Sequence, residues 1–193
     1  MNKLFFFILL FSINISMSAQ NTISLDQAYQ YINSTDGIPD NVSYIKDINN
    51  KLDPFIGTWK GSYDNKIFEI KFEKKINDGN SDLFWDRLYG RLLVKNSING
   101  AVLFNSMSNN LADTGVMSGF TFQRNTYMLD FVYKSECNDV GMVYIEKSNN
   151  IPNSITLYFN RNSNLIYDMS SQCPNYRDYK TLLPLNKITL TKQ

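Results

Sequence analysis

The side chains that could perform chemistry in this 193-residue chain are mainly carboxylates, because the sequence contains no histidine. Histidine serves general acid–base catalysis, the Ser-His-Asp and Cys-His nucleophiles, many zinc sites and the proximal ligand of haem. The glycine-rich phosphate-binding patterns and the nucleophile elbow of hydrolases are also absent from the sequence. These classes of enzyme are therefore excluded.

Two pairs of acidic residues are the candidate catalytic groups. Asp82 and Asp86 flank a Phe-Trp dipeptide, and Glu136 and Asp139 flank Cys137. Paired carboxylates beside an aromatic ring suit glycoside hydrolysis, where the two acids flank the scissile bond. Acidic residues near turns, however, more commonly cap backbone N–H groups or face solvent. We therefore expect no catalysis, no metal site and no cofactor.

The two cysteines, Cys137 and Cys173, predict one structural disulfide in an exported protein. Residues 1–19 have the pattern of a secretory signal, with Lys3, an apolar run and small residues ending at Ala19. The apolar run is shorter than the ~20 residues of a spanning helix. We expect cleavage, a periplasmic or extracellular location, and no membrane span in the mature chain. In an oxidising compartment the bridge would stabilise the fold by about 3–4 kcal/mol; two free thiols are the alternative.

Composition indicates a folded, strand-rich domain without a polyanionic partner. Hydrophobic residues make up 43% of the chain and aromatic residues 14%, which favours strands over disorder. The 19 basic and 18 acidic residues give a net charge of +1, with no basic cluster. We therefore expect no nucleic-acid partner.

The candidate groups must be positioned by two kinds of segment, and we divide the chain at residue 53. After the signal peptide (1–19), residues 20–53 form a predicted helical segment, and residues 54–193 form the predicted antiparallel β-barrel domain. Ser24 and Gln27 have the capping-box spacing at the start of the first predicted helix. A second predicted helix begins at Ser43 and runs to about Lys51.

After Pro54 the apolar residues change to a period of two, which indicates strands. Short turns join these strands, including Asp64-Asn65 and a predicted tight hairpin at Asn99-Gly100. The predicted strands cover residues 57–63, 66–74, 84–96, 101–105, 116–123, 126–134, 139–147, 154–161 and 187–192. This pattern predicts a mainly β protein, an antiparallel barrel of eight or nine strands preceded by two short N-terminal helices.

Large aromatic side chains alternate along the predicted inward face of the barrel. One hypothesis is an apolar ligand cavity lined by Trp59, Phe72, Phe120 and Phe131. The alternative is that crowded aromatic rings simply fill the barrel.

Two resemblances accompany this pattern. The run Phe55-Ile56-Gly57-Thr58-Trp59-Lys60 resembles the first-strand motif of the calycins, that is, the lipocalins and fatty-acid-binding proteins. That resemblance implies a lipocalin-like barrel with Trp59 packed across one end and a basic residue over it, with Arg177 and Lys187 as candidates. Residues 44–59 and 188–193, with the signal, resemble a family of small secreted Bacteroidetes proteins classed as a domain of unknown function. This second resemblance implies a secreted β-rich protein and brings no activity with it.

Two functions follow as hypotheses. The first is an exported lipocalin-like barrel that binds a small apolar ligand inside. The second is a filled barrel that acts as a cell-surface or secreted protein-interaction module, without ligand or catalysis. In the second hypothesis, the loops at residues 106–114 or 162–184 contact the partner protein.

Overall fold

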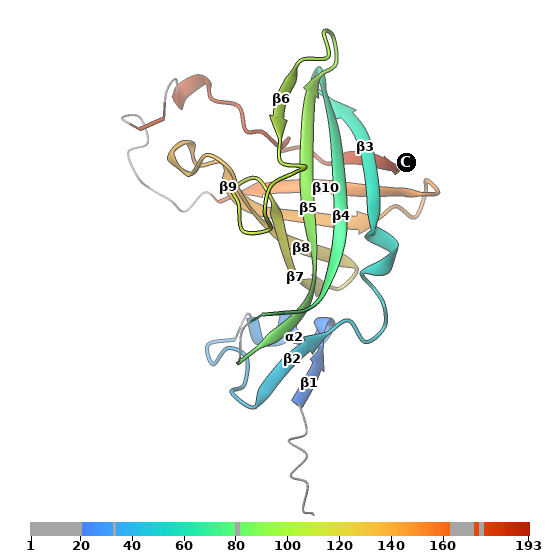
Figure 1. Ribbon diagram of the computed structural model, residues 1–193, viewed down its shortest axis with the longest axis vertical. Helices are drawn as coiled ribbons and strands as arrows, with labels where there is room; N and C mark the ends of the chain where they lie inside the picture. The colour runs from blue at the N-terminus through green and yellow to red at the C-terminus, as the bar shows by residue number, and fades with distance from the viewer. Residues whose placement is uncertain (1–20, 33, 80–81, 163–171, 174–175) are drawn as a thin grey trace, which may run out of the picture.

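The computed structural model describes residues 21–32, 34–79, 82–162, 172–173 and 176–193, so the predicted signal peptide lies outside the described residues. Within the described part, the eleven strands belong to one sheet, and most of them close into a barrel (Figure 1). The elements are β1 (Asn21–Ser24), α2 (Leu25–Ile32), β2 (Val42–Lys46), η1 (Asp53–Phe55), β3 (Gly57–Tyr63), β4 (Lys66–Gly79), β5 (Phe84–Asn96), β6 (Val102–Asn105), β7 (Met117–Gln123), β8 (Thr126–Val132), η2 (Ser135–Cys137), β9 (Val140–Lys147), β10 (Ser154–Arg161), η4 (Tyr176–Asp178) and β11 (Ile188–Lys192).

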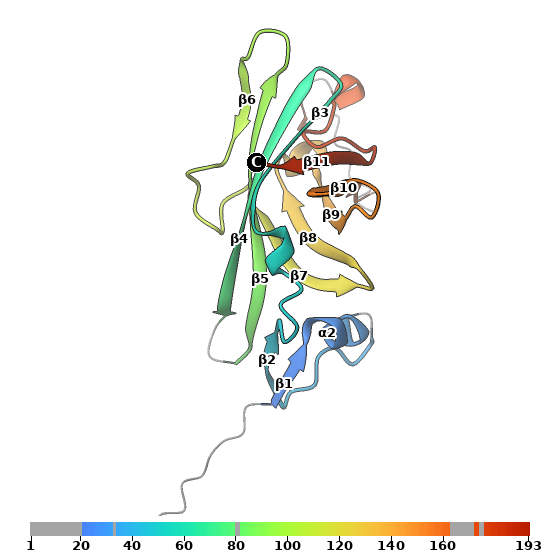
Figure 2. The same cartoon turned by 90° about the vertical axis from the view of Figure 1, so that its right-hand side faces the viewer.

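The barrel is an eight-stranded antiparallel meander in the order β5-β4-β3-β11-β10-β9-β8-β7. It closes where β5 pairs with β7, through Tyr89 opposite Ser118 and Gly90 opposite Met117. The views in Figures 1 and 2 show β4 and β5 forming one wall, and β9 and β10 crossing their direction on the other. Strand β6 lies outside this ring and pairs only with β5. The predicted antiparallel barrel is confirmed.

The hairpins show which turn predictions hold. Asp64 and Asn65 both have positive φ, 47° and 57°, and form the predicted two-residue turn between β3 and β4. The predicted tight turn at Asn99-Gly100 is wrong, because Asn96 and Ala101 pair across a four-residue loop. In that loop the Asn96 side chain accepts the Ile98 N–H at 2.8 Å. This local hydrogen bond stabilises a longer turn, in which only Gly100 needs positive φ.

The N-terminal segment contains one α-helix among the described residues, not the predicted two. Helix α2 begins with the predicted capping box: Gln27 N–H donates to Ser24 Oγ at 3.2 Å, and Ser24 N–H donates to Gln27 Oε1 at 2.8 Å. The first part of the predicted second helix is instead strand β2, which lies parallel to both β1 and β5, and residues 47–51 form a turn. Hydrogen bonds to neighbouring strands override the helical spacing here, and a single segment's spacing does not reveal those neighbours.

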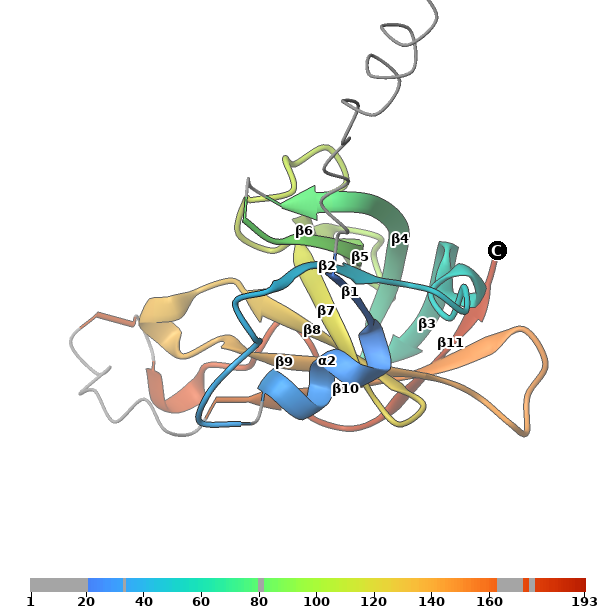
Figure 3. The ribbon, with the colours of Figure 1, turned by 90° about the horizontal axis from the view of Figure 1, so that it is seen from below.

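Strand β2 and helix α2 pack against the barrel rather than forming a separate layer. Figure 3 shows α2 lying across one end of the barrel beside β7. The Thr121 hydroxyl on β7 donates to the Leu25 carbonyl at 2.6 Å. Leu25, Ala28 and Ile45 are buried in the same hydrophobic core as the barrel residues. This end of the barrel is therefore covered.

Large side chains occupy the middle of the barrel. The fully buried set includes Trp59, Phe68, Phe72, Tyr127, Phe131 and Phe159. Cys137 and Cys173 form the predicted disulfide, with a Cα–Cα distance of 4.9 Å. Within the described residues, no helix is long and apolar enough to cross a membrane.

Candidate functional site

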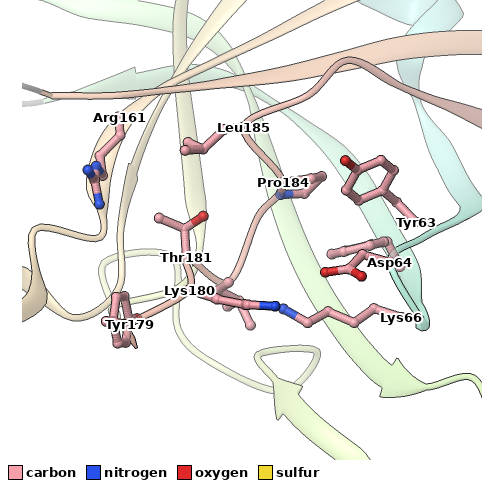
Figure 4. A pocket seen from close by; sticks show the side chains of 11 residues that line it. Tyr63, Asp64, Lys66, Arg161, Tyr179, Lys180, Thr181, Pro184 and Leu185 are labelled. Atoms are coloured by element: carbon pink, nitrogen blue, oxygen red, sulfur yellow. The ribbon is translucent and has the colours of Figure 1, made fainter. Parts of the chain in front are cut away.

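A hollow lies at the end of the barrel where β3 turns into β4 (Figure 4). Its volume is about 270 Å³. It is lined by the β3–β4 hairpin, the last residue of β10 and the segment before β11: Tyr63, Asp64, Lys66, Phe68, Arg161, Tyr179, Lys180, Thr181, Leu182, Pro184 and Leu185. We call this hollow the barrel-end pocket.

Strand alternation explains why two of the charged side chains lie at the mouth of an apolar barrel. Lys66 is two residues before the buried Phe68 on β4, and Arg161 is two residues after the buried Phe159 on β10. Residues two apart on a strand share a face. Each polar side chain therefore continues an inward-facing row beyond the apolar core, to the point where the barrel opens.

The third wall is a segment held in place by a buried carboxylate. Asp139 Oδ2 accepts hydrogen bonds from the Tyr179 hydroxyl and from the Leu182 N–H, each at 2.8 Å. Leu182 and Leu183 are buried in the core, so this segment closes the barrel beneath the pocket. Asp139 follows directly on the disulfide-bonded turn at Cys137, which fixes its position.

Burial raises the pKa of Asp139 above the ordinary value for aspartate. The hydrogen bonds from Leu182 and Tyr179 act in the opposite direction, as do the positive charges of Arg161 and Lys66. Burial and the bond to Asp139 also raise the pKa of Tyr179. Asp139 Oδ1 is buried and has no hydrogen-bond partner among the described residues.

The charges around the pocket are mostly positive. Lys66, Arg161 and Lys180 line it, against the single carboxylate of Asp64. None of the three cations forms an ion pair with another described residue. Figure 4 shows the ammonium groups of Lys66 and Lys180 pointing toward one another across the hollow. Two converging cations beside aromatic and apolar walls can hold an anion that carries an apolar part.

A model of a protein family of unknown function, DUF6705, matches residues 1–193. The chain belongs to this family. No curated protein and no solved structure matches the chain. Membership in the family brings no assigned activity, so the function must be argued from the geometry.

The structure places the four predicted ligand residues away from the barrel-end pocket. Trp59, Phe72 and Phe131 are at most 2% exposed and belong to the packed core. Phe120 is half-buried at a β-bulge between Gly119 and Thr121. The bulge takes Phe120 out of the alternating pattern, and its carbonyl accepts the Trp85 indole N–H at 2.6 Å.

The predicted carboxylate pairs do not face a shared reaction centre. Asp86 is buried and accepts hydrogen bonds from the Tyr44 hydroxyl at 2.5 Å and from the Asp47 and Asn77 N–H groups at 3.0 Å. Asp82 is exposed, and so is Glu136, whereas Asp139 is fully buried. Asp86 and Asp139 therefore organise backbone. Among the described residues, no group of His, Cys, Asp or Glu could hold a metal ion.

The cation over Trp59 is Lys192, not Arg177 or Lys187. Lys192 Nζ lies 5.4 Å from the centre of the Trp59 ring, while the indole N–H donates to the Phe55 carbonyl at 2.6 Å. Lys192 reaches the ring because β11 pairs with β3 and sets it opposite Trp59. That pairing is a long-range contact, which spacing along the chain does not indicate.

Proposed function

We propose that this protein is an exported, non-catalytic binding protein that holds a small organic anion in the barrel-end pocket. The observation that carries this proposal is the convergence of Lys66 and Lys180 on a hollow with aromatic walls, where neither forms an ion pair with another described residue. Unpaired cations that face one hollow favour a ligand that brings the missing negative charge.

The size of the pocket supports a ligand of one ring rather than a lipid. Its volume of about 270 Å³ lies at the low end of the roughly 300–1,000 Å³ of small-molecule sites. Tyr63 and Tyr179 offer ring faces, and Leu182 and Pro184 offer apolar contact. A carboxylate or phosphate attached to an aromatic ring matches this combination. This ligand would lie at the mouth of the barrel rather than in its filled middle.

Two features support export and relatedness to the calycins. The Cys137–Cys173 disulfide fits an oxidising compartment and agrees with a secretory signal at residues 1–19. The eight-stranded meander, with the buried Trp59 on its first strand and Lys192 over the ring, fits a lipocalin-like barrel.

The test is calorimetric titration of the mature protein with phenyl phosphate and benzoate, with benzyl alcohol as the neutral analogue. We expect the anions to bind at least about tenfold more tightly than the alcohol, because each charge-assisted hydrogen bond is worth ~1.5–3 kcal/mol. The double variant Lys66→Gln/Lys180→Gln should remove that preference. Lys60→Gln, at an exposed lysine on the outer side of β3, is the matched control. Equal affinity for the alcohol, or anion binding by the double variant, would reject the proposal.

The β5–β6 hairpin favours a second function, contact with another protein. Its exposed apolar side chains are Ile98 (79% exposed), Val102 (58%) and Leu103 (46%). Figures 1 and 2 show this hairpin projecting beyond the barrel. Site-specific crosslinking from position 98 in the secreting cell, with position 60 as control, tests it. A discrete protein adduct from position 98 alone supports a partner protein. If no adduct forms, this second function is rejected.

A further inference from the structure

A second surface with binding chemistry lies on the outside of the barrel, on β8, β9 and β10. The register sets Met128, Tyr144 and Tyr158 in one row across these three strands. The flanking residues on each strand, such as Leu129, Val143 and Phe159, are buried in the barrel. Since successive side chains on a strand point to opposite faces, the row faces outward.

Neighbouring hollows along this face share lining residues. A hollow of about 320 Å³ is lined by Tyr144, Tyr158 and Asn160, among other residues. A neighbouring hollow of about 480 Å³ shares Tyr144 and Asn160 with it and extends to Asp130. On the other side, a hollow of about 580 Å³ shares Gln123 and Glu146. We call the surface formed by these three neighbouring hollows the outer groove. It runs along the strands and suits an extended chain rather than a compact molecule.

Two neighbouring tyrosine rings line the outer groove. The centroids of Tyr144 and Tyr158 are 6.1 Å apart, and the ring planes differ by 28°. At that distance nearly parallel rings are offset, so each leaves part of its face uncovered. Tyr158 is 37% exposed. The two tyrosines therefore leave uncovered ring surface in the hollow that they line.

The groups around the rings are mostly neutral donors and acceptors. Gln123, Thr156 and Asn160 line the same hollow as the two tyrosines, and so do the charged residues Glu146 and Lys187. A pyranose ring has C–H faces that pack on aromatic rings and equatorial hydroxyls that bond to amides, hydroxyls and carboxylates at its edge. Both halves of that chemistry are present in the outer groove.

Other extended ligands fit the outer groove less well. Strands β8, β9 and β10 are each paired on both sides within the closed barrel, so they offer no free edge to which a peptide could add as a strand. The carboxylates of Asp130 and Glu146 balance the cations of Arg124 and Lys187 that line the same hollows, so the groove has no excess positive charge to attract a nucleic acid or another polyanion. We propose that the outer groove binds a neutral oligosaccharide, with Tyr144 and Tyr158 as its stacking platform.

The experiment is affinity gel electrophoresis of the mature protein in gels that contain xyloglucan, mannan, mixed-linkage glucan or arabinoxylan. A hexasaccharide of the strongest retarding polymer is then titrated by calorimetry. We expect Tyr144→Ala and Tyr158→Ala each to weaken binding by about tenfold, the loss of one stacked ring. Tyr158→Phe keeps the ring and should stay within about threefold of the natural protein. Tyr176→Ala, at a tyrosine of matching exposure (39%) away from the groove, is the control.

Three results would overturn the proposal: no retardation by any of these polymers, full binding by both alanine variants, or an equal loss on Tyr176→Ala. If an alanine variant does not fold, ring NMR signals of Tyr144 and Tyr158 in the natural protein decide. They should shift on addition of the hexasaccharide, and unmoved signals reject the site. Lys66→Gln/Lys180→Gln should bind the hexasaccharide normally, so failure at the barrel-end pocket and failure here are distinguishable.

Discussion

Gly57 illustrates how one residue position depends on a partner far along the chain. Its φ is +122°, and a Cβ there would lie 3.0 Å from Lys192 Cε, the side chain that covers Trp59. We predict that Gly57→Ala lowers the free energy of unfolding by about 1–3 kcal/mol, because it adds backbone strain and displaces Lys192. Urea denaturation measures this.

Gly100→Ala is the control for the Gly57 prediction. Gly100 also has positive φ (+72°), but nothing lies within 4 Å of its Cβ position. Its substitution should therefore cost only the backbone term, and less than Gly57→Ala. A loss at Gly57 no larger than that at Gly100 would contradict the role given to Lys192.

The contacts of Asp86 identify it as a structural carboxylate, so its substitution should lower the stability of the protein. Its two oxygens accept three hydrogen bonds, from Tyr44, Asp47 and Asn77. An asparagine has one acceptor oxygen in place of two, so it leaves a buried donor unpaired. We predict that Asp86→Asn lowers the free energy of unfolding by about 1–3 kcal/mol, and that Asp36→Asn, at an exposed position, does not. An unchanged denaturation midpoint for Asp86→Asn would refute the assignment.

At the scale of elements, sequence reasoning succeeds where the determining contacts are local. The capping box at Ser24 and Gln27 and the turn at Asp64-Asn65 involve neighbours within a few residues, and both form as predicted. The sequence predicts a helix at strand β2 because the strand is formed by pairing with β1 and β5. Neither pairing can be inferred from the spacing of apolar residues within β2 itself. Local rules therefore locate strands of the barrel better than they locate its N-terminal extension.

The candidate pocket was not predicted for the same physical reason. Lys66 and Lys180 are separated by most of the barrel sequence and meet only because Asp139 fixes the segment that carries Lys180. A signal was nevertheless present. Lys66 and Arg161 extend the inward-facing rows of β4 and β10. A cation at the end of such a row indicates that the row has left the apolar interior and reached the open end of the barrel.

The Asp139 anchor gives a pH-dependent prediction for this element. Burial raises its folded-state pKa, so the folded protein holds a proton that the unfolded chain has already released. The contribution of Asp139 to the free energy of unfolding is therefore largest at acid pH. It falls as the pH rises from about 3.9, the ordinary aspartate pKa, to the raised value.

Asp139→Asn removes this titration, so the variant is the reference for the natural protein. We expect the difference in unfolding free energy, natural protein minus Asp139→Asn, to decrease with rising pH across that window. Chemical denaturation of both proteins at a series of pH values measures the difference. A difference that stays level, or grows with pH, would show that burial does not raise the pKa of Asp139 in the folded protein.

At the scale of the whole molecule, the period-two pattern was enough to predict an antiparallel barrel, but not how it closes. Closure requires only two residue pairs between β5 and β7, and Gly90 at that junction leaves space for Phe72 and Met117. A side chain at Gly90 would displace the Phe72 ring, 2.7 Å from its Cβ position. The shape of the barrel thus depends on complementary volumes on separate strands, which become visible only once the strands are paired.

Filling of the barrel distinguishes an end-pocket binding protein from one that carries its ligand inside. Phe131 is fully buried and packs edge-on against Phe159, with ring centroids 5.7 Å apart. In a filled interior, Phe131→Ala leaves a cavity, and we predict a loss of about 3–5 kcal/mol in the free energy of unfolding. Val132→Ala, the outward-facing neighbour that is 41% exposed, should change it by at most ~0.5 kcal/mol. If Phe131 instead lined an existing ligand cavity, truncation would only enlarge that space. A loss below ~1 kcal/mol, on the scale of an ordinary substitution, would therefore favour a ligand inside the barrel over one at its mouth.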